Sequence, residues 1–283
     1  MRLILIIGFL LLNLQAKSLF SNDAQKENSI YINNLKELLL ATQKTRGLTN
    51  SYLNGNTASL LLVYNSRSDI KKAIGKMEST TLATDVVINS RASDISKSLI
   101  KLNSIAFKQA PKKTFGDYTQ EIEQILMLAQ TISQRTSKDL NPFGKEASSI
   151  MMNDMLPLTE YVGQLRGYGS GVAARGVIKK SDIEQVYLLV NEMTTYNTTL
   201  QDDMSGLLSK YSGKLPKSLR EELVNINKQV EQYQFLASKK LLKSPKDVDS
   251  DLFFEKGTML IKAIVKAYNS SNRAILEDSK GWL

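Results

Sequence analysis

Apolar residues recur at helical spacing along most of the chain. In the first such segment, the positions that follow a 4-3-4-3-4 spacing and so share one helix face are Leu35, Leu39, Thr42, Arg46, Thr49 and Leu53. Breaks between such segments predict eight helices, over residues 23–53, 57–76, 82–107, 115–138, 145–175, 182–211, 216–242 and 252–277. Since long helices with short connections pack against antiparallel neighbours, we expect an all-α fold of two up-and-down four-helix bundles.

The clearest break in the middle of the chain is the segment Asp139-Leu-Asn-Pro-Phe-Gly144, which is rich in turn-forming residues. We place the boundary there, with a first bundle over residues 17–140 and a second over 141–283. The two halves also share a similar segment, because Thr42–Leu53 aligns with Val162–Ala173 at a separation of 120 positions. Duplication of one bundle would produce this similarity, although chance similarity stays open.

The first 16 residues have the parts of a secretory signal peptide. Met1-Arg2 is followed by an apolar run over residues 3–12 and by the small residue Ala16. That run is shorter than the roughly 20 apolar residues that cross a membrane. We therefore expect cleavage after Ala16 and a periplasmic or otherwise extracytoplasmic protein. The alternative is an uncleaved membrane anchor.

Composition removes most kinds of chemistry. The 283 residues include no Cys and no His, so thiolate nucleophiles, disulfides, zinc–cysteine sites and histidine bases are all excluded. The carboxylates, together with Tyr52 and Lys44, show no spacing typical of an acid–base pair. We expect that the protein is not an enzyme and that it binds no metal and no cofactor. The net charge of +9 is spread over single or paired lysines, which does not favour nucleic-acid binding.

Two arginines stand at positions that should be buried. Arg46 lies on the apolar face of the first helix, and Arg166 is in register with Val162, Gly169 and Ala173. An unpaired buried cation costs several kcal/mol, so a carboxylate, water or a bound anion must compensate it. A guanidinium group matches planar oxyanions through two parallel hydrogen bonds.

The surroundings of both arginines suit an anion. Gly163, Gly167 and Gly171 repeat every fourth residue and leave one helix face without side chains, which favours close approach of a ligand or, equally, of another helix. Hydroxyl groups that could donate further hydrogen bonds belong to Thr42, Thr49, Thr159 and Ser170. We expect an anion to be held between two helices, one from each half.

The segments around these arginines resemble the nitrate- and nitrite-sensing (NIT) domain family. Lys44-Thr-Arg46-Gly47-Leu48-Thr49-Asn-Ser-Tyr52-Leu53 is similar to its opening Arg-Gly segment, and Leu158–Gly176 resembles its second. Ser66–Asp69 and Leu252–Ile261, with an aromatic-x-x-x-Thr stretch, are similar to two further motifs. The resemblance covers residues 24–280. It implies nitrate or nitrite bound between two bundles, with Arg46 and Arg166 as ligands and Arg175 ranked lower. The full predicted site comprises Arg46, Arg166, Thr49, Gly47, Gly167, Thr42 and Ser170.

One departure concerns the output of the signal. Members of this family are normally input modules joined to a membrane helix and an output domain, and from this sequence we expect no output domain. We therefore expect an anion sensor that signals through a separate membrane partner; a homodimer is left open. The alternative is a ligand-free structural or interaction protein of the cell envelope. A carboxylate already paired with either arginine would favour that alternative.

Overall fold

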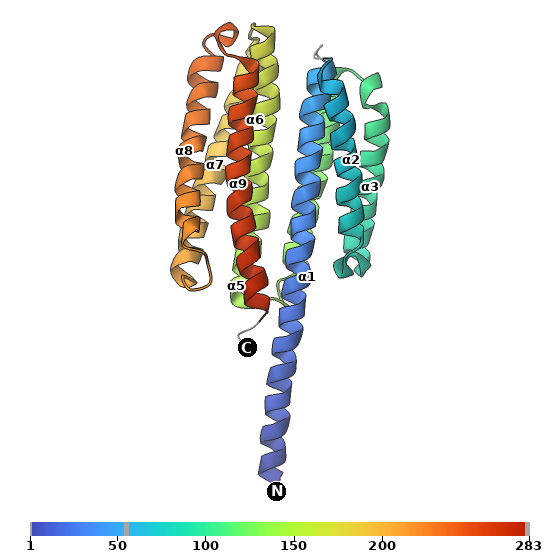
Figure 1. The fold of residues 1–283 in the computed structure, drawn as a ribbon, viewed down its shortest axis with the longest axis vertical. Coiled ribbons are helices and arrows are strands. Elements are labelled where there is room, and N and C mark those ends of the chain that lie inside the picture. The colour runs from blue at the N-terminus through green and yellow to red at the C-terminus, as the bar shows by residue number, and fades with distance from the viewer. Residues whose placement is uncertain (1, 54–56, 281–283) are drawn as a thin grey trace.

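The computed structural model describes residues 2–53 and 57–280, with side chains from Asp23 onward. The described chain is all-helical (Figure 1). Its α-helices are α1 (Arg2–Leu53), α2 (Ser59–Glu78), α3 (Val86–Ile105), α4 (Pro111–Thr136), α5 (Pro142–Ile150), α6 (Leu156–Arg175), α7 (Lys180–Lys210), α8 (Ser218–Phe235) and α9 (Ser250–Ser279). Short 3₁₀ helices cover Thr81–Thr84, Ala106–Lys108 and Pro245–Asp247, and π turns cover Met151–Met155 and Leu236–Leu241.

The eight predicted helices correspond to these elements, because a π turn joins α5 to α6 without a break in the helix. Pro157 lies just after this turn. Proline lacks an N–H and crowds the carbonyl four residues earlier, so a local π turn is a natural adjustment. The predicted stop at Asn54–Asn56 lies outside the described residues. In the part of the chain with described side chains, no helix has the length and apolar character needed to span a membrane.

Helix α1 is longer than predicted, since it continues to Arg2 and its first turns project beyond the rest of the molecule (Figure 1). The side chains of the expected signal peptide are not described, so cleavage after Ala16 stays a prediction.

Short polar caps fix the helix ends. Asn141 accepts a hydrogen bond from the Gly144 amide and precedes Pro142, the first residue of α5. Asp249 caps α9 in the same way, accepting from the amides of residues 251 and 252. Gly176 ends α6 with φ +63°, a left-handed conformation that favours glycine. Helix α4 ends at Thr136 and α5 begins at Pro142, and the division of the chain into two bundles at this point stays a prediction.

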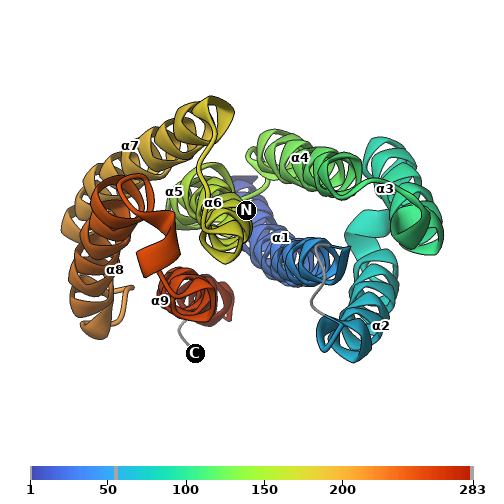
Figure 2. The same ribbon diagram turned by 90° about the horizontal axis from the view of Figure 1, so that it is seen from above.

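Seen from above, the helices lie in two groups, α1–α4 and α5–α9, which we call the first and second helix groups (Figure 2). Helices α1 and α6 lie at the centre, where each packs against the other group as well as its own. Buried apolar side chains from both groups form one continuous core. This arrangement places the two arginine-bearing helices side by side.

Candidate functional site

Helices α1 and α6 run parallel and in register across the boundary between the two groups. Asn28 Nδ2 donates to Ser148 Oγ over 3.1 Å, at a separation of 120 positions. A methyl group placed on Gly163 would lie 3.2 Å from the Gln43 side chain, again 120 positions away. A constant offset between contacting residues means that Arg46 and Arg166, which are also 120 positions apart, lie at the same level.

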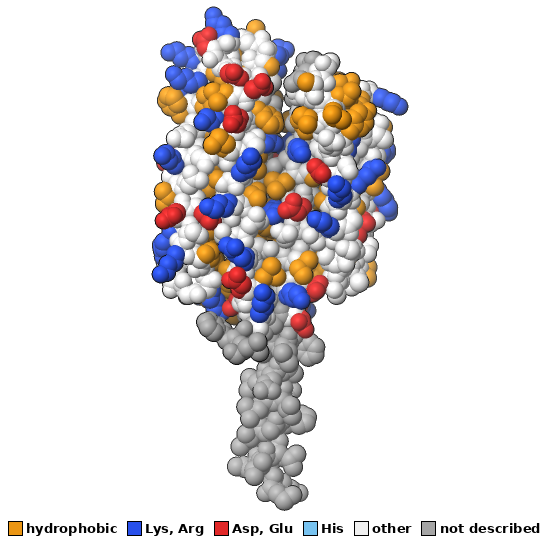
Figure 3. All heavy atoms as spheres, in the orientation of Figure 1, with side chains coloured by type: hydrophobic (Ala, Val, Ile, Leu, Met, Phe, Trp, Pro, Cys, Tyr) orange, Lys and Arg blue, Asp and Glu red, His pale blue; other side chains and the backbone are white. Residues whose placement is uncertain are grey.

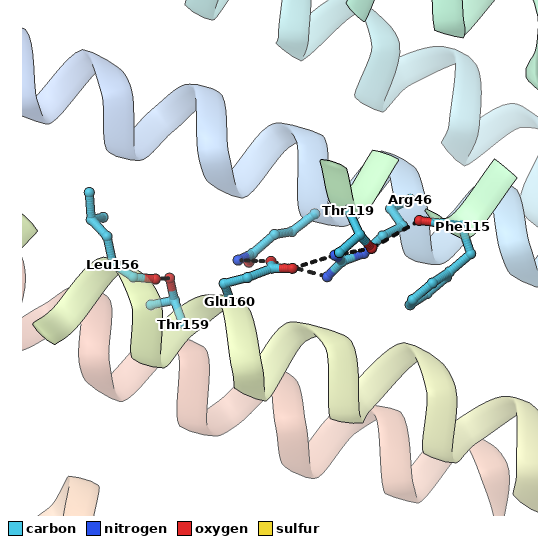
Figure 4. A network of polar contacts seen from close by, with 7 residues as sticks. Arg46, Phe115, Thr119, Leu156, Thr159 and Glu160 are labelled. Carbon is cyan, nitrogen blue, oxygen red and sulfur yellow. Dashed lines mark hydrogen bonds and ion pairs between the residues drawn. The ribbon is translucent and has the colours of Figure 1, made fainter. Parts of the chain in front are cut away.

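Arg46 is paired with a carboxylate across this boundary. Its Nη1 lies 2.5 Å from Glu160 Oε1, and its Nη2 lies 3.2 Å from Glu160 Oε2 (Figure 4). Gln43 Nε2 donates to the same Oε2 over 2.9 Å. Arg46 is 1% exposed and Glu160 2% exposed. The buried charge of Arg46 is therefore compensated by a carboxylate rather than by an external anion.

Helix α4 completes the surroundings of Arg46. Arg46 Nη1 also donates to Thr119 Oγ1 over 3.0 Å, and its guanidinium carbon lies 4.9 Å from the centre of the Phe115 ring (Figure 4). A cation held over an aromatic face is favourable, because the face carries partial negative charge. Hydroxyl, ring and carboxylate together enclose the guanidinium.

Arg166 has a similar enclosure without the carboxylate. Its Nη1 donates to Thr258 Oγ1 over 3.0 Å, and its guanidinium carbon lies 4.5 Å from the centre of the Phe254 ring. Its Nε is buried and has no hydrogen-bond partner. Arg166 is 7% exposed, and no carboxylate of the described residues lies within ion-pair distance of it. Its surroundings therefore provide hydrogen bonds but no counter-ion.

Burial lowers the pKa of Arg166 to about 10, and the nearby charge of Arg46 acts in the same direction. The group is thus still cationic at neutral pH. Gly257 allows α9 to approach it, because a methyl group there would lie 2.8 Å from Arg166 Cβ and from Tyr233 Oη. Tyr233 Oη is also buried without a partner. Arg166 and the unsatisfied Tyr233 hydroxyl therefore both lie against this glycine.

A cavity of about 290 Å³ lies beside Arg166, between α1, α2, α6 and α9. Its polar lining comes from Arg166, Gln43, Lys44 and Thr258, and its other walls are apolar. Since a water molecule takes up about 30 Å³ of liquid, a four-atom anion and several waters would fit. The surface of this cavity is mostly apolar. Of the two cations beside it, Lys44 is paired with Asp69 and Arg166 has no carboxylate partner among the described residues.

A second cavity, of about 370 Å³, lies closer to the end of the molecule that is farthest from the N-terminus. Gly47, Gly167 and Ser170 line it, and Phe254 forms a wall of both cavities. Figure 3 shows the surface notched between the two helix groups at this end. The two cavities share Leu48, Leu62 and Phe254 as lining residues. Among the described side chains, no cluster of carboxylates is arranged to hold a metal ion.

The chain is similar to known proteins in sequence family and in fold. Residues 37–276 match the family described as nitrate and nitrite sensing. The chain belongs to this family. A solved structure of the NasR transcription antiterminator shares the fold, with a TM-score of 0.75 and 13% sequence identity over 98% of this chain and 75% of that one. A search of curated protein sequences gives no significant match.

Within this nitrate- and nitrite-sensing domain, the predicted site residues separate into three sets. Arg166 lines the inner cavity, whereas Gly47, Gly167 and Ser170 line the outer one. Arg46 lies at the same level but faces Glu160. The hydroxyl groups of Thr42 and Ser170 donate to backbone carbonyls four residues earlier, as hydroxyls inside helices often do.

Thr49 and two other flanking residues point elsewhere. The Thr49 hydroxyl is buried in the first helix group beside Tyr118 rather than at the boundary with α6. Thr159 Oγ1 donates to the carbonyl of Leu156. Arg175, which was ranked lower, forms an ion pair of 2.9 Å with Asp182. The expectation that hydroxyls from both helices converge on one anion is therefore not met by Thr42, Thr49 or Thr159.

Sequence reasoning missed Glu160, Gln43 and Thr258. Thr258 had a signal, because Phe254-x-x-x-Thr258 repeats the spacing of Phe115-x-x-x-Thr119. No comparable signal marks Glu160, since its partner lies 114 positions away on another helix.

Proposed function

We propose that this chain senses nitrate or nitrite by binding one anion in the inner cavity, with Arg166 as the main ligand. The observation that carries the proposal is a buried guanidinium that has no carboxylate partner among the described residues and borders a cavity. Thr258, whose hydroxyl proton goes to the Phe254 carbonyl, would hold Arg166 in place rather than contact the anion. The Gln43 N–H that Glu160 does not accept would be a further donor, and Lys44 would add positive charge. The outer cavity, with Gly47, Gly167 and Ser170, would be the route of entry.

We further propose that the two helix groups act as two four-helix bundles that the ligand draws together. The inner cavity takes its walls from both groups, so an anion there would contact both. A ligand shifts an equilibrium only by its differential affinity for the two states, and contact with both groups supplies that difference. Arg46 would hold α1 against α6 through Glu160 in either state.

Export and a separate membrane partner are part of the same proposal. The basic start and apolar run of residues 1–16 support export to the periplasm or another extracytoplasmic space. A sensor there would transmit its state to a protein in the membrane rather than catalyse a reaction. Sequencing the N-terminus of the protein recovered from the producing cell tests cleavage after Ala16. An uncleaved terminus would overturn that part of the proposal.

Titration calorimetry with nitrate, nitrite, chloride and formate on the wild type and on Arg166→Gln tests the binding. At roughly 1.5 kcal/mol per non-hydrogen atom at best, three- or four-atom anions should have a Kd of tens of micromolar or weaker. We expect nitrate or nitrite to bind the wild type and not the variant. Heat absent from the wild type at millimolar anion, or equal heat from both proteins, would overturn the proposal.

The second candidate is a ligand-free interaction protein of the cell envelope. The Arg46–Glu160 pair favours it, because the protein itself already compensates one of the two buried arginines. This candidate predicts that no anion raises the melting temperature of the wild type.

A further inference from the structure

The surroundings of the two arginines repeat each other residue by residue. Phe115 and Phe254 cover the two guanidinium groups, and Thr119 and Thr258 accept a hydrogen bond from them over the same 3.0 Å. Both pairs of equivalent residues are separated by 139 positions. The chain therefore contains two copies of one guanidinium-binding arrangement, one in each helix group.

The copies differ at two positions beside the guanidinium. Gly163 lies next to Arg46, and the residue 120 positions earlier is Gln43. The second difference is the carboxylate. Glu160 on α6 pairs with Arg46, and the residue 120 positions earlier on α1 is Leu40. Leu40 lines the inner cavity together with Arg166. The carboxylate in one copy is thus replaced by an apolar side chain and a cavity in the other.

We propose that the Glu160 carboxylate is an internal ligand that fills the anion site of the Arg46 copy. A carboxylate is a planar group with two oxygens, like nitrite, and Arg46 contacts both oxygens with two nitrogens. Gln43 donates a further hydrogen bond to it. In chemical terms the Arg46 copy is a site for a small planar oxyanion that the Glu160 carboxylate occupies. The Arg166 copy is the same kind of site without a carboxylate.

The inference rests on the proposed function for the class of anion. It adds an expected number of external anions bound per chain. One copy is closed by the chain itself, so the wild type would take one external anion. Removing the Glu160 carboxylate while leaving Arg46 would open a second site.

Chemical rescue of Glu160→Ala tests this. The substitution removes the carboxylate and leaves a space of about its size beside Arg46. We expect a lower melting temperature that rises again with the logarithm of added formate, nitrite or nitrate, because a ligand that binds only the folded state stabilises it. Calorimetry should count two anions per chain in place of one. No rescue and an unchanged count would overturn the inference.

Glu222→Ala is the matched control. Glu222 is also buried, at 6% exposure, and its cationic neighbour is the exposed Lys266, at 3.6 Å. Its loss should lower the melting temperature without any gain in response to anions. Equal anion rescue of Glu160→Ala and Glu222→Ala would show a general salt effect and would overturn the inference.

Two further variants keep the outcome decisive. In Glu160→Ala/Arg166→Gln the external site of the proposed function is removed, so one bound anion there supports the internal-ligand inference even if the wild type binds none. If Glu160→Ala does not fold without added anion, folding restored by formate supports the inference. Failure to fold in formate, nitrite and nitrate alike would require Glu160→Ser, which also leaves space beside Arg46 and for which an anion-independent melting temperature would overturn the inference.

Discussion

Arg46 and Arg166 occupy equivalent positions on two parallel helices, yet one has a counter-ion and the other does not. Each guanidinium lies over a phenylalanine ring and donates to a threonine hydroxyl. Only Arg46 meets a carboxylate, because Glu160 stands where the other helix has Leu40. An arginine on an apolar helix face can thus be neutralised within the protein or left without a counter-ion. The residue at the facing position of the neighbouring helix determines which of the two occurs.

Breaking the Arg46–Glu160 pair should have the largest effect. Arg46→Leu leaves the Glu160 carboxylate buried without a cation, which should lower the free energy of unfolding by about 3–5 kcal/mol. Arg46→Leu/Glu160→Leu removes both charges and should recover most of that loss, as urea denaturation of the single and double variants would measure.

The control is the ion pair between Lys44 and Asp69, whose side chains are both about half exposed and 3.5 Å apart. Lys44→Leu should change the free energy of unfolding by no more than about 1 kcal/mol, since water screens exposed pairs. A loss from Arg46→Leu as small as that from Lys44→Leu would mean that the buried pair contributes little.

Adding a carboxylate to the other copy should weaken ligand binding. In Leu40→Glu the new side chain would face Arg166, as Glu160 faces Arg46, and should compete with any external anion. We expect affinity for nitrate and nitrite to fall roughly 100-fold, or about 2.8 kcal/mol, in titration calorimetry. Leu40→Gln, of the same size and without charge, should bind almost as the wild type does. Undiminished binding by Leu40→Glu would place the anion away from Arg166.

The sequence alone was sufficient for the helices and for the burial of both arginines. The 3.6-residue period places Arg46 among apolar neighbours, and the helix boundaries follow from prolines and polar caps such as Asn141. It could not identify the partner of Arg46. Whether an acid meets that arginine depends on how α1 and α6 are placed against each other, and no local pattern around Glu160 encodes this placement.

The same limit explains Thr49. It shares the apolar face of α1 with Arg46, but that face is wide and contacts both its own helix group and the second one. Arg46 lies where α1 meets both α6 and α4, whereas Thr49 lies beside Tyr118 of α4, inside the first helix group. Spacing shows that two residues share a face, and it does not show which neighbouring helix each of them meets.

A further difference between the central helices should give a pH dependence. Asp154, in the π turn before α6, is buried, and this burial together with the charge of Asp203 raises its pKa to about 7. The position 120 residues earlier is Asn34, which does not titrate. Between about pH 4 and pH 7 the folded state retains a proton that the unfolded state has lost, so stability should fall as the pH rises.

The slope from this one group is at most about 1.4 kcal/mol per pH unit. Asp154→Asn makes the two helices alike at this position and should flatten the urea-denaturation stability profile between pH 4 and pH 7. Asp139→Asn, on the loop before α5, serves as the control and should leave the profile in place. If the free energy of unfolding of Asp154→Asn still fell with pH as steeply as that of the wild type, another group would be responsible for the pH dependence.

The smallest expected effect compares the two glycines that follow the arginines. A methyl group on Gly47 would lie 3.6 Å from the Phe254 ring, an ordinary contact, whereas one on Gly167 would lie 3.1 Å from the Phe115 ring and would require that ring to move. Alanine is favoured over glycine inside a helix by about 1 kcal/mol. Gly47→Ala should therefore raise the free energy of unfolding. In Gly167→Ala the cost of displacing the Phe115 ring should cancel most or all of the same increase. The two thermal unfolding curves should differ in that order. Phe115 covers Arg46, which is paired with Glu160, and Phe254 covers Arg166 beside the cavity. If Gly167→Ala were the more stable variant, the Phe115 ring would move aside more easily than the Phe254 ring.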